Sequence, residues 1–213
     1  TLPGEKVLAE ITKVSKKLAF ADAVEVLSAS QYRVTPPCKY AGACGGCDWQ
    51  HADVAYQCEM KTSILREQLV RLGKIAEDSD IVKSAKVSPL RANEDGLHWR
   101  TRVEYATDTR GRAGFRRHAS HDVVTVGECV VAVPSISGDG ITNVPWQADG
   151  EVRAVATSGE DVVLLPLGAG DQKVVERVGK YSYELRARGF WQGHVSAPEV
   201  FVREVQRLVD PQV

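Results

Sequence analysis

Three cysteines with metal-binding spacing lie close together near the start of the chain. Cys38, Cys44 and Cys47 form a C-x5-C-x2-C pattern in a stretch that also contains glycines. Thiolates on a short irregular loop can converge on one metal centre, and glycine permits the backbone angles that convergence requires. Three ligands do not complete a cluster, and the fourth could be Cys129, which follows the apolar stretch DVVTVGE. The cysteines therefore predict a metal or iron–sulfur centre.

Other assignments of the cysteines are open at this point. Cys44 and Cys47, followed by His51, give a partial match to zinc-binding spacing, so a structural zinc is an alternative. An electron carrier is disfavoured because the ferredoxin spacings C-x2-C-x2-C and C-x4-C-x2-C are absent. The fifth cysteine, Cys58, lies on the apolar face of a predicted helix, where we expect a buried core residue.

The composition is that of a globular protein with a real core. The 213 residues are 43% hydrophobic and 26% charged, and 27 basic against 28 acidic residues give a net charge of -1. No overall field indicates a nucleic-acid partner, so such a partner must be inferred from a local patch. The sequence shows neither a membrane-spanning stretch nor signal-peptide features, and we expect a cytoplasmic monomer without a membrane partner.

One segment is strongly basic. Between His98 and His121 the arginines are Arg100, Arg102, Arg110, Arg112, Arg116 and Arg117, against only two acidic residues, Glu104 and Asp108. Guanidinium planes and aromatic rings suit phosphate contacts and stacking on unpaired RNA bases. The predicted RNA-binding residues here are Arg100, Arg102, Phe115, Arg116 and Arg117, and Lys16 and Lys17 could extend the surface. The alternative is an ordinary solvated strand face.

Residue patterns predict an α+β protein that is mostly β. Alternation over residues 5–33, with a turn at Lys16-Lys17, is typical of antiparallel strands in a small barrel. The helical period over 53–72 predicts a helix with Asp53 as N-cap and Gly73 at C′. A second helix should follow Ser196 and bury Phe201, Val205 and Leu208. Antiparallel strands are predicted near 99–105, 112–117, 122–133, 151–157, 161–167, 172–178 and 181–188.

Four segments of the sequence resemble, in this order, segments of the iron–sulfur uracil-C5 RNA methyltransferases. They are CKYAGACGGCDWQH at 38–51, WRTR at 99–102, GFR at 114–116 and EC at 128–129. These enzymes make 5-methyluridine in ribosomal or transfer RNA. The resemblance implies a [4Fe–4S] cluster on Cys38, Cys44, Cys47 and Cys129, with S-adenosylmethionine as methyl donor. The segment GFWQGH at 189–194 resembles the entry to the methyltransferase domain, usually Phe-x-Gln-x-Asn, with His194 in place of the asparagine.

The same resemblance implies an organisation and a role. It places a partial TRAM-like, OB-like RNA-binding barrel at 1–35, the cluster and central RNA-binding domain at 36–135, a continuation of the β region at 136–188, and the start of a methyltransferase domain at 189–213. Gln192 would face the cofactor and target uridine, and Phe190 would contact RNA. Because the catalytic nucleophile and base are expected after the end of this segment, we expect an RNA-recognition half that is not catalytic alone. A stand-alone RNA-binding module with zinc or a cluster is the alternative.

Overall fold

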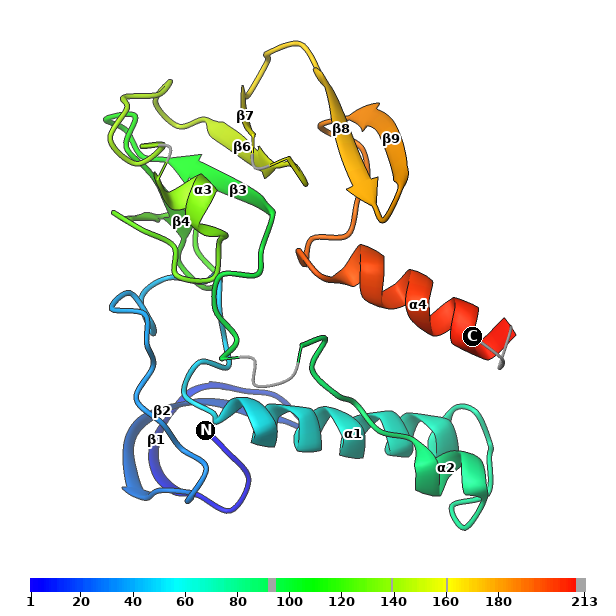
Figure 1. Cartoon of the computed structure of the whole chain (residues 1–213). Helices are drawn as coiled ribbons and strands as arrows, with labels where there is room; N and C mark the ends of the chain where they lie inside the picture. Colours follow the sequence, from blue (N-terminus) through cyan, green and yellow to red (C-terminus); the bar gives the residue numbers. More distant parts are fainter. Residues whose placement is uncertain (92–94, 139, 160, 210–213) are drawn as a thin grey trace. The chain divides into compact units, whose positions relative to one another are not determined.

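The computed structural model describes residues 1–91, 95–138, 140–159 and 161–209. These residues form two compact units, which are described separately (Figure 1). The first unit contains residues 1–36 and 49–87. The second contains residues 37–48 and 88–213, so the cysteine loop belongs with the second unit. The predicted mixture of helix and strand, with strand in excess, is confirmed.

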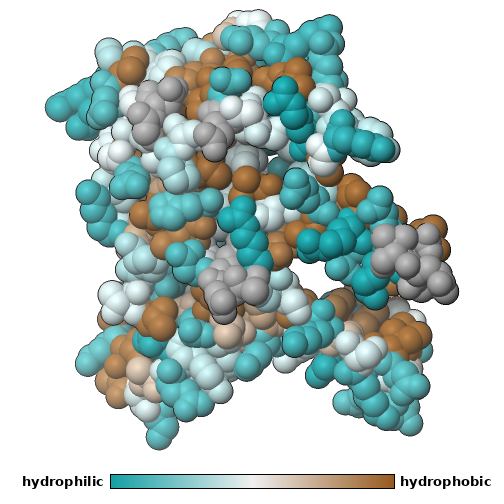
Figure 2. Space-filling model, in the orientation of Figure 1, coloured by the Kyte–Doolittle hydropathy of each residue, from teal (hydrophilic) through white to brown (hydrophobic). Residues whose placement is uncertain are grey.

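A two-stranded antiparallel ribbon begins the first unit. Strand β1 (Lys6–Val14) pairs with β2 (Ala19–Ser28), and the Ser15 N–H donates to the Leu18 carbonyl across the predicted turn. The described residues contain only this pair of the expected barrel. Apolar side chains of both strands, including Leu8, Ile11 and Phe20, are therefore exposed. Figure 2 shows apolar surface in the part of the view where the ribbon lies.

A buried carboxylate closes the open end of this ribbon. The Glu5 side chain is fully buried and accepts hydrogen bonds from Arg33 Nε at 2.6 Å and Arg33 Nη2 at 2.8 Å. It also accepts from the backbone N–H groups of Leu2 and Ser30. The Arg33 hydrogen bonds, together with these backbone donors, hold the pKa of Glu5 well below its usual range.

Helix α1 (Val54–Arg71) follows the ribbon. The Asp53 side chain accepts from the Tyr56 N–H, so its predicted role as N-cap is confirmed. At the other end Lys74, not Gly73, takes the left-handed conformation, with φ of 56°, and a Cβ at Gly73 would lie 2.6 Å from the Leu69 carbonyl oxygen. Glycine is needed there for close approach of the backbone rather than for its φ angle.

The prediction that Cys58 is a core residue is wrong. No residue of α1 is buried, and Cys58 is only half-buried. Within the first unit the short helix α2 (Asp80–Ser84) packs against α1, and Arg66 donates to the Lys83 and Ala85 carbonyls. A five-residue helix cannot cover the apolar positions along an 18-residue helix, so these positions remain accessible.

The second unit is built on a five-stranded antiparallel sheet in the order β5-β4-β3-β6-β7. Its strands are β3 (Arg102–Thr107), β4 (Ala113–Arg116), β5 (Val123–Thr125), β6 (Glu151–Ala156) and β7 (Val162–Pro166). Tyr105, Ile136 and Ile141 are fully buried against one face, and α3 (Pro134–Gly138) contributes Ile136. The predicted strand at 122–133 is much shorter than expected, because the chain turns away after Thr125 and carries Cys129 into a loop.

A hairpin and a helix complete this unit. Strands β8 (Lys173–Val178) and β9 (Tyr181–Arg186) pair as predicted, and Val174 packs in a second small core with Val155, Leu165 and Ala187. Helix α4 (Ala197–Val209) begins directly after Ser196, whose hydroxyl accepts from Arg91. The expected burial of its apolar side chains is wrong: Phe201, Val205 and Leu208 are exposed. Among the described residues no helix could cross a membrane.

Candidate functional site

The cysteine loop is tied to the sheet at two points. The Gly127 N–H donates to the Tyr40 hydroxyl at 2.8 Å, and the Gly45 N–H donates to the Arg116 carbonyl at 3.0 Å. A Cβ at Gly45 would lie 2.8 Å from both that carbonyl oxygen and the His118 nitrogen. Any larger residue at Gly45 would push the loop away from β4. The loop is therefore held close to the segment that carries Cys129.

The four predicted cysteines interact with one another. Burial raises the pKa of the Cys44 thiol, and the neighbouring thiols of Cys47, Cys129 and Cys38 raise it further, against one N–H donated to its sulfur by Gly46 at 3.4 Å. Burial also raises the pKa of Cys129. All four are half-buried, and none forms a disulfide within the described residues. The fold thus places Cys129 near the cysteines of the loop, although the two segments are far apart in the sequence.

Backbone donors point at the sulfur atoms of this group. The Gly46 N–H donates to the Cys44 sulfur at 3.4 Å, and the backbone N–H groups of Val131 and Ala132 act against the burial that raises the pKa of Cys129. Such donors favour thiolates. Across the described ranges, however, no three His, Cys, Asp or Glu side chains lie close enough to hold a single metal ion. His51, considered as a zinc ligand, has a buried Nε2 without a hydrogen-bond partner among the described residues.

Half of the six arginines in the predicted basic segment form ion pairs within the described residues. Arg102 pairs with Glu176 at 2.7 Å, Arg116 with Glu151 at 2.8 Å, and Arg112 with Asp108 at 2.8 Å. Two of these three glutamate and aspartate partners lie outside residues 98–121. The Arg102 side chain is only 13% exposed, and its Nε is buried without a partner in the part of the chain described. Arg102 is therefore placed to hold the fold together rather than to contact RNA.

The remaining predicted RNA-binding residues have different surroundings. Arg117, Lys16 and Lys17 are exposed, and no ion pair of theirs is found within the described residues. The Arg100 guanidinium lies 4.9 Å from the centre of the Trp99 ring, and the Trp99 ring stacks on His194 at 5.4 Å. Phe115 is half-buried and its ring packs at 4.8 Å against Tyr105. Within the second unit, Arg100 and Phe115 thus contact other aromatic rings, whereas Arg117 is exposed.

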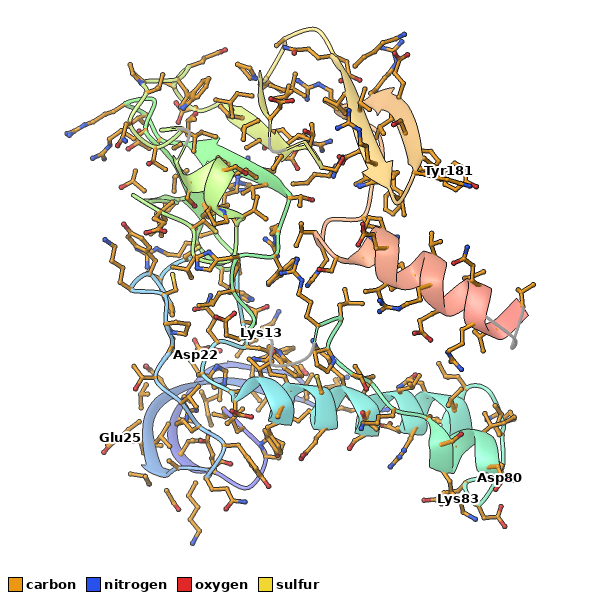
Figure 3. All side chains as sticks on the ribbon, in the orientation of Figure 1. Lys13, Asp22, Glu25, Asp80, Lys83 and Tyr181 are labelled. Atoms are coloured by element: carbon orange, nitrogen blue, oxygen red, sulfur yellow. The ribbon has the colours of Figure 1, made fainter. Side chains whose placement is uncertain are left out.

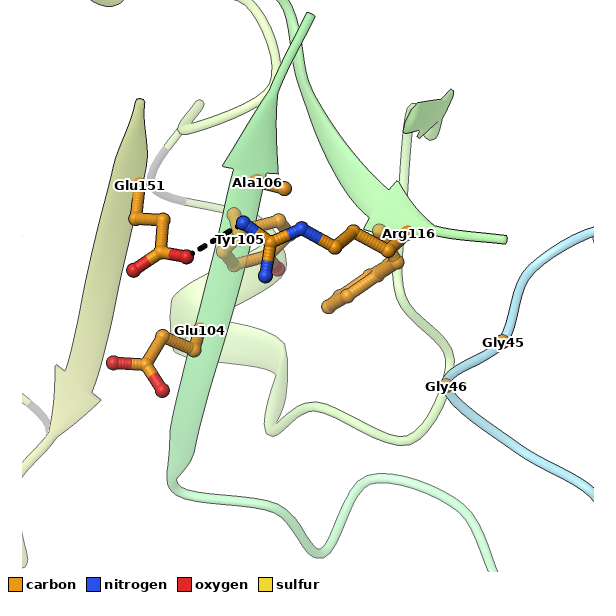
Figure 4. Close-up of a pocket in the computed structure, with 8 residues that line it drawn as sticks. Gly45, Gly46, Glu104, Tyr105, Ala106, Arg116 and Glu151 are labelled. Carbon is orange, nitrogen blue, oxygen red and sulfur yellow. Dashed lines mark hydrogen bonds and ion pairs between the residues drawn. The ribbon is translucent and has the colours of Figure 1, made fainter. Parts of the chain in front are cut away.

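A pocket of about 230 Å³ adjoins the cysteine loop (Figure 4). Arg116 extends over it toward Glu151, and Glu104 lies on the neighbouring strand. Glu104 is itself paired with Arg153 at 2.9 Å. The full lining comprises Gly45, Gly46, Glu104, Tyr105, Ala106, Phe115, Arg116 and Glu151. Acidic and basic side chains thus lie side by side on the wall of this pocket.

The segment predicted to meet cofactor and target lies beside β3. The Thr101 N–H donates to the Gly193 carbonyl at 2.8 Å, which fixes the backbone next to Gln192. The Gln192 side chain is half-buried, and the Phe190 side chain is 85% exposed. His194, at the position of the usual asparagine, accepts the Ser196 N–H on Nδ1 at 3.1 Å. Its ring therefore caps the start of α4 in addition to stacking on Trp99.

The sequence interpretation missed an aromatic group on the last hairpin. Tyr181 and Tyr183 are exposed on β9, and Trp191 contacts Tyr183 with ring centres 5.7 Å apart. The alternation in YSYELR was interpreted only as a strand signal. Two aromatic residues on the same face of that strand could have indicated a surface as well.

Comparisons with known proteins find similarity to RNA methyltransferases. No family model matches the chain. A protein of Streptomyces avermitilis named an uncharacterized RNA methyltransferase is 36% identical, over 99% of this chain and 58% of its own length. The 23S rRNA (uracil(1939)-C(5))-methyltransferase RlmD of Halomonas elongata is 37% identical over 64% of this chain and 27% of its own length. The chain spans between about a quarter and just over half of these relatives.

A solved structure shares the fold. The tRNA (uracil-54, C5)-methyltransferase of Pyrococcus abyssi, in complex with S-adenosyl-L-homocysteine, superposes with a TM-score of 0.69 at 19% identity. The match covers 98% of this chain and 59% of that chain. The similarity in sequence and in fold thus extends over both units described above.

Proposed function

We propose that this chain is the RNA-recognition part of an S-adenosylmethionine-dependent RNA (uracil-C5) methyltransferase. The observation that carries the proposal is the match over nearly the whole chain to proteins named RNA methyltransferases. Their names include a uracil-C5 enzyme acting on 23S rRNA, and the shared fold is that of a tRNA uracil-C5 enzyme. The names of those proteins state the RNA substrate and the bound S-adenosyl-L-homocysteine. We propose the same class of substrate and of methyl donor for this chain.

We further propose that Cys38, Cys44, Cys47 and Cys129 hold a [4Fe–4S] cluster. The Cys44 thiol has the other three thiols as neighbours and receives the Gly46 N–H, and four cysteine thiolates are the usual ligands of such clusters. Four thiolates about 2.3 Å from one zinc ion would have to lie closer together than any described group does. In a [4Fe–4S] cluster each thiolate binds a different iron atom. The four sulfur atoms can therefore lie farther apart than they would around a single zinc ion.

The role of the cluster would be structural. Methyl transfer moves no electrons from the protein, and the cysteine loop contains no helix or strand; Tyr40 packs against the core, and the Tyr40 and Gly45 hydrogen bonds tie the loop to the second unit. Ligation by Cys129 would connect this loop covalently to the segment after β5. Metal binding of this kind contributes directly to folding free energy.

The chain's own contribution to catalysis would be to hold RNA. A base cannot be methylated while stacked, so the target uridine must be extruded, at a cost of a few kcal/mol. RNA contacts remote from the reacting carbon can offset this cost. The residues with the exposure or the chemistry for such contacts are Phe190, Arg117, Arg100, Lys16 and Lys17. Gln192 would meet the methyl donor or the target, and we place neither nucleophile nor base in this chain.

The proposal is tested with the full-length protein encoded by the gene. The purified protein is incubated with methyl-labelled S-adenosylmethionine and total RNA from a strain lacking the gene, and the RNA is digested to nucleosides. Labelled 5-methyluridine is expected. Labelled nucleosides of another kind, or binding to RNA without methylation, would instead favour a different modification or the stand-alone RNA-binding module.

A further inference from the structure

The exposed aromatic side of the β8–β9 hairpin has no role in the function proposed above. The Tyr181 side chain is 60% exposed and that of Tyr183 is 44% exposed. Figure 3 shows Tyr181 projecting outward from β9. The Trp191 ring lies 5.7 Å from that of Tyr183, inclined by 48°. Three aromatic rings therefore gather on a surface that the described second unit leaves open to solvent.

The hairpin fixes the two backbone positions from which the tyrosine side chains project. Tyr181 pairs with Val178 and Tyr183 with Glu176, and both of those β8 side chains are buried. Because directly paired residues share a face, the tyrosines are anchored on the same side as the hairpin's core contacts. The connection is a tight turn in which Gly179 takes a left-handed φ of +54°. Little conformational freedom would be lost when a ligand stacks on these rings.

A cation accompanies the rings. Lys180 at the turn places its Nζ 5.5 Å from the centre of the Tyr181 ring. A nucleotide brings a flat base and a phosphate together, which match an aromatic ring with an ammonium group beside it. Stacking on aromatic rings with nearby basic groups is the usual way in which proteins hold unpaired nucleotides.

We infer that Tyr181 and Tyr183 form a stacking platform for unpaired bases of the RNA substrate, with Lys180 contacting a phosphate. This inference rests on the proposed function and adds a contact surface to it. Every base has a flat face, so the platform is tolerant of sequence and selects unpaired over paired RNA. Trp191, whose ring contacts Tyr183, directly precedes Gln192, so the platform lies next to this residue along the chain.

Binding is measured by fluorescence anisotropy with the full-length protein. The probe is a labelled single strand of about 12 nucleotides, within the usual range of single-strand site sizes, and its perfect duplex serves for comparison. We expect Tyr181→Ala and Tyr183→Ala each to weaken single-strand binding about tenfold. Tyr181→Phe should bind like the wild type, because the ring remains. Lys180→Ala should lower the slope of log affinity against log salt concentration by about 0.7, the value for one phosphate contact.

Val175→Ala is the matched control. Val175 is an exposed apolar residue on the other face of the same hairpin, and its replacement should leave RNA binding unchanged. If the wild type binds and the tyrosine variants bind equally well, the platform is refuted while the proposed function stands. If the wild type binds no RNA, the stacking platform and the proposed function both fail. A lowered melting temperature in the tyrosine variants, or conversion of a dimer to a monomer, would show a packing role and overturn the platform.

Discussion

Arg102 on β3 and Glu176 on β8 form an ion pair of 2.7 Å in which the two side chains are only 13% and 3% exposed. The second carboxylate oxygen of Glu176 accepts the Ser158 N–H at 2.9 Å. The pair therefore joins the five-stranded sheet to the hairpin that carries the aromatic platform. An arginine that the sequence placed on an RNA surface is instead a structural element of the second unit.

Replacement of Glu176 by alanine should lower the free energy of unfolding by about 3 kcal/mol, because it leaves the Arg102 guanidinium buried without its partner. Urea denaturation measures the effect. Glu184→Ala, which breaks the exposed pair with Lys173 in the same hairpin, is the control and should change little. Equal losses in the two variants would mean that the buried pair has no special role.

The strands of the second unit could be predicted from the sequence, whereas its charge distribution could not. Strand periodicity is local, and each strand from β3 to β9 begins and ends within a few residues of its prediction, except β5, which ends early. Charge neutralisation is not local. Glu151 and Glu176 come from strands far along the chain from Arg116 and Arg102, so counting charges within one segment overestimates the basic surface.

The buried Glu5 carboxylate should make the stability of the first unit depend on pH. Its pKa is lowered from an ordinary value of 4.5, so its ionised form stabilises the fold above that value and the stabilisation is lost as the pH falls below it. The melting temperature of Glu5→Gln should be below that of the wild type at pH 7, and the gap should narrow between about pH 5 and pH 3. A gap independent of pH would contradict this account.

Gly45 should not tolerate a side chain. Its Cβ would meet backbone atoms of β4 at 2.8 Å, and we expect Gly45→Ala to cost about 2 kcal/mol of unfolding free energy, as overpacking usually does. The metal-free protein is used, so that the effect of loop packing is separated from that of ligation. Gly127→Ala, whose nearest atom would be the Tyr40 hydroxyl at 3.6 Å, should be tolerated. An equal loss of unfolding free energy in Gly45→Ala and Gly127→Ala would contradict close packing of the cysteine loop against β4.

Among the arginines of the central segment, Arg117, which has no ion pair within the described residues, should matter more for RNA than the paired Arg112. Arg117→Ala should weaken single-strand binding and lower the slope of log affinity against log salt by about 0.7, the value for one phosphate contact. Arg112→Ala should have a smaller effect, because Asp108 neutralises Arg112 in the free protein. Titrations at several salt concentrations distinguish the two. A larger slope change for Arg112→Ala would refute the assignment.

The candidate site was predictable where its chemistry depends on residue type, and not where it depends on what covers a surface. Cysteine spacing indicated the four-thiol group, including the distant Cys129. The helical period in α4 correctly predicted a helix, but periodicity identifies an apolar face without showing its partner, so Phe201 and Leu208 remain exposed in the described chain. Tyr181 and Tyr183 were missed because a strand pattern does not state which face stays open.

The most direct test of the central claim measures 5-methyluridine in cells. A strain lacking the gene is complemented with the wild-type gene, with Cys129→Ser or with Cys58→Ser, and ribosomal and transfer RNA are digested and analysed by mass spectrometry. We predict that deletion removes 5-methyluridine from one position, and that the wild type and Cys58→Ser restore it while Cys129→Ser does not. Unchanged 5-methyluridine in the deletion strain, or full restoration by Cys129→Ser, would contradict the account.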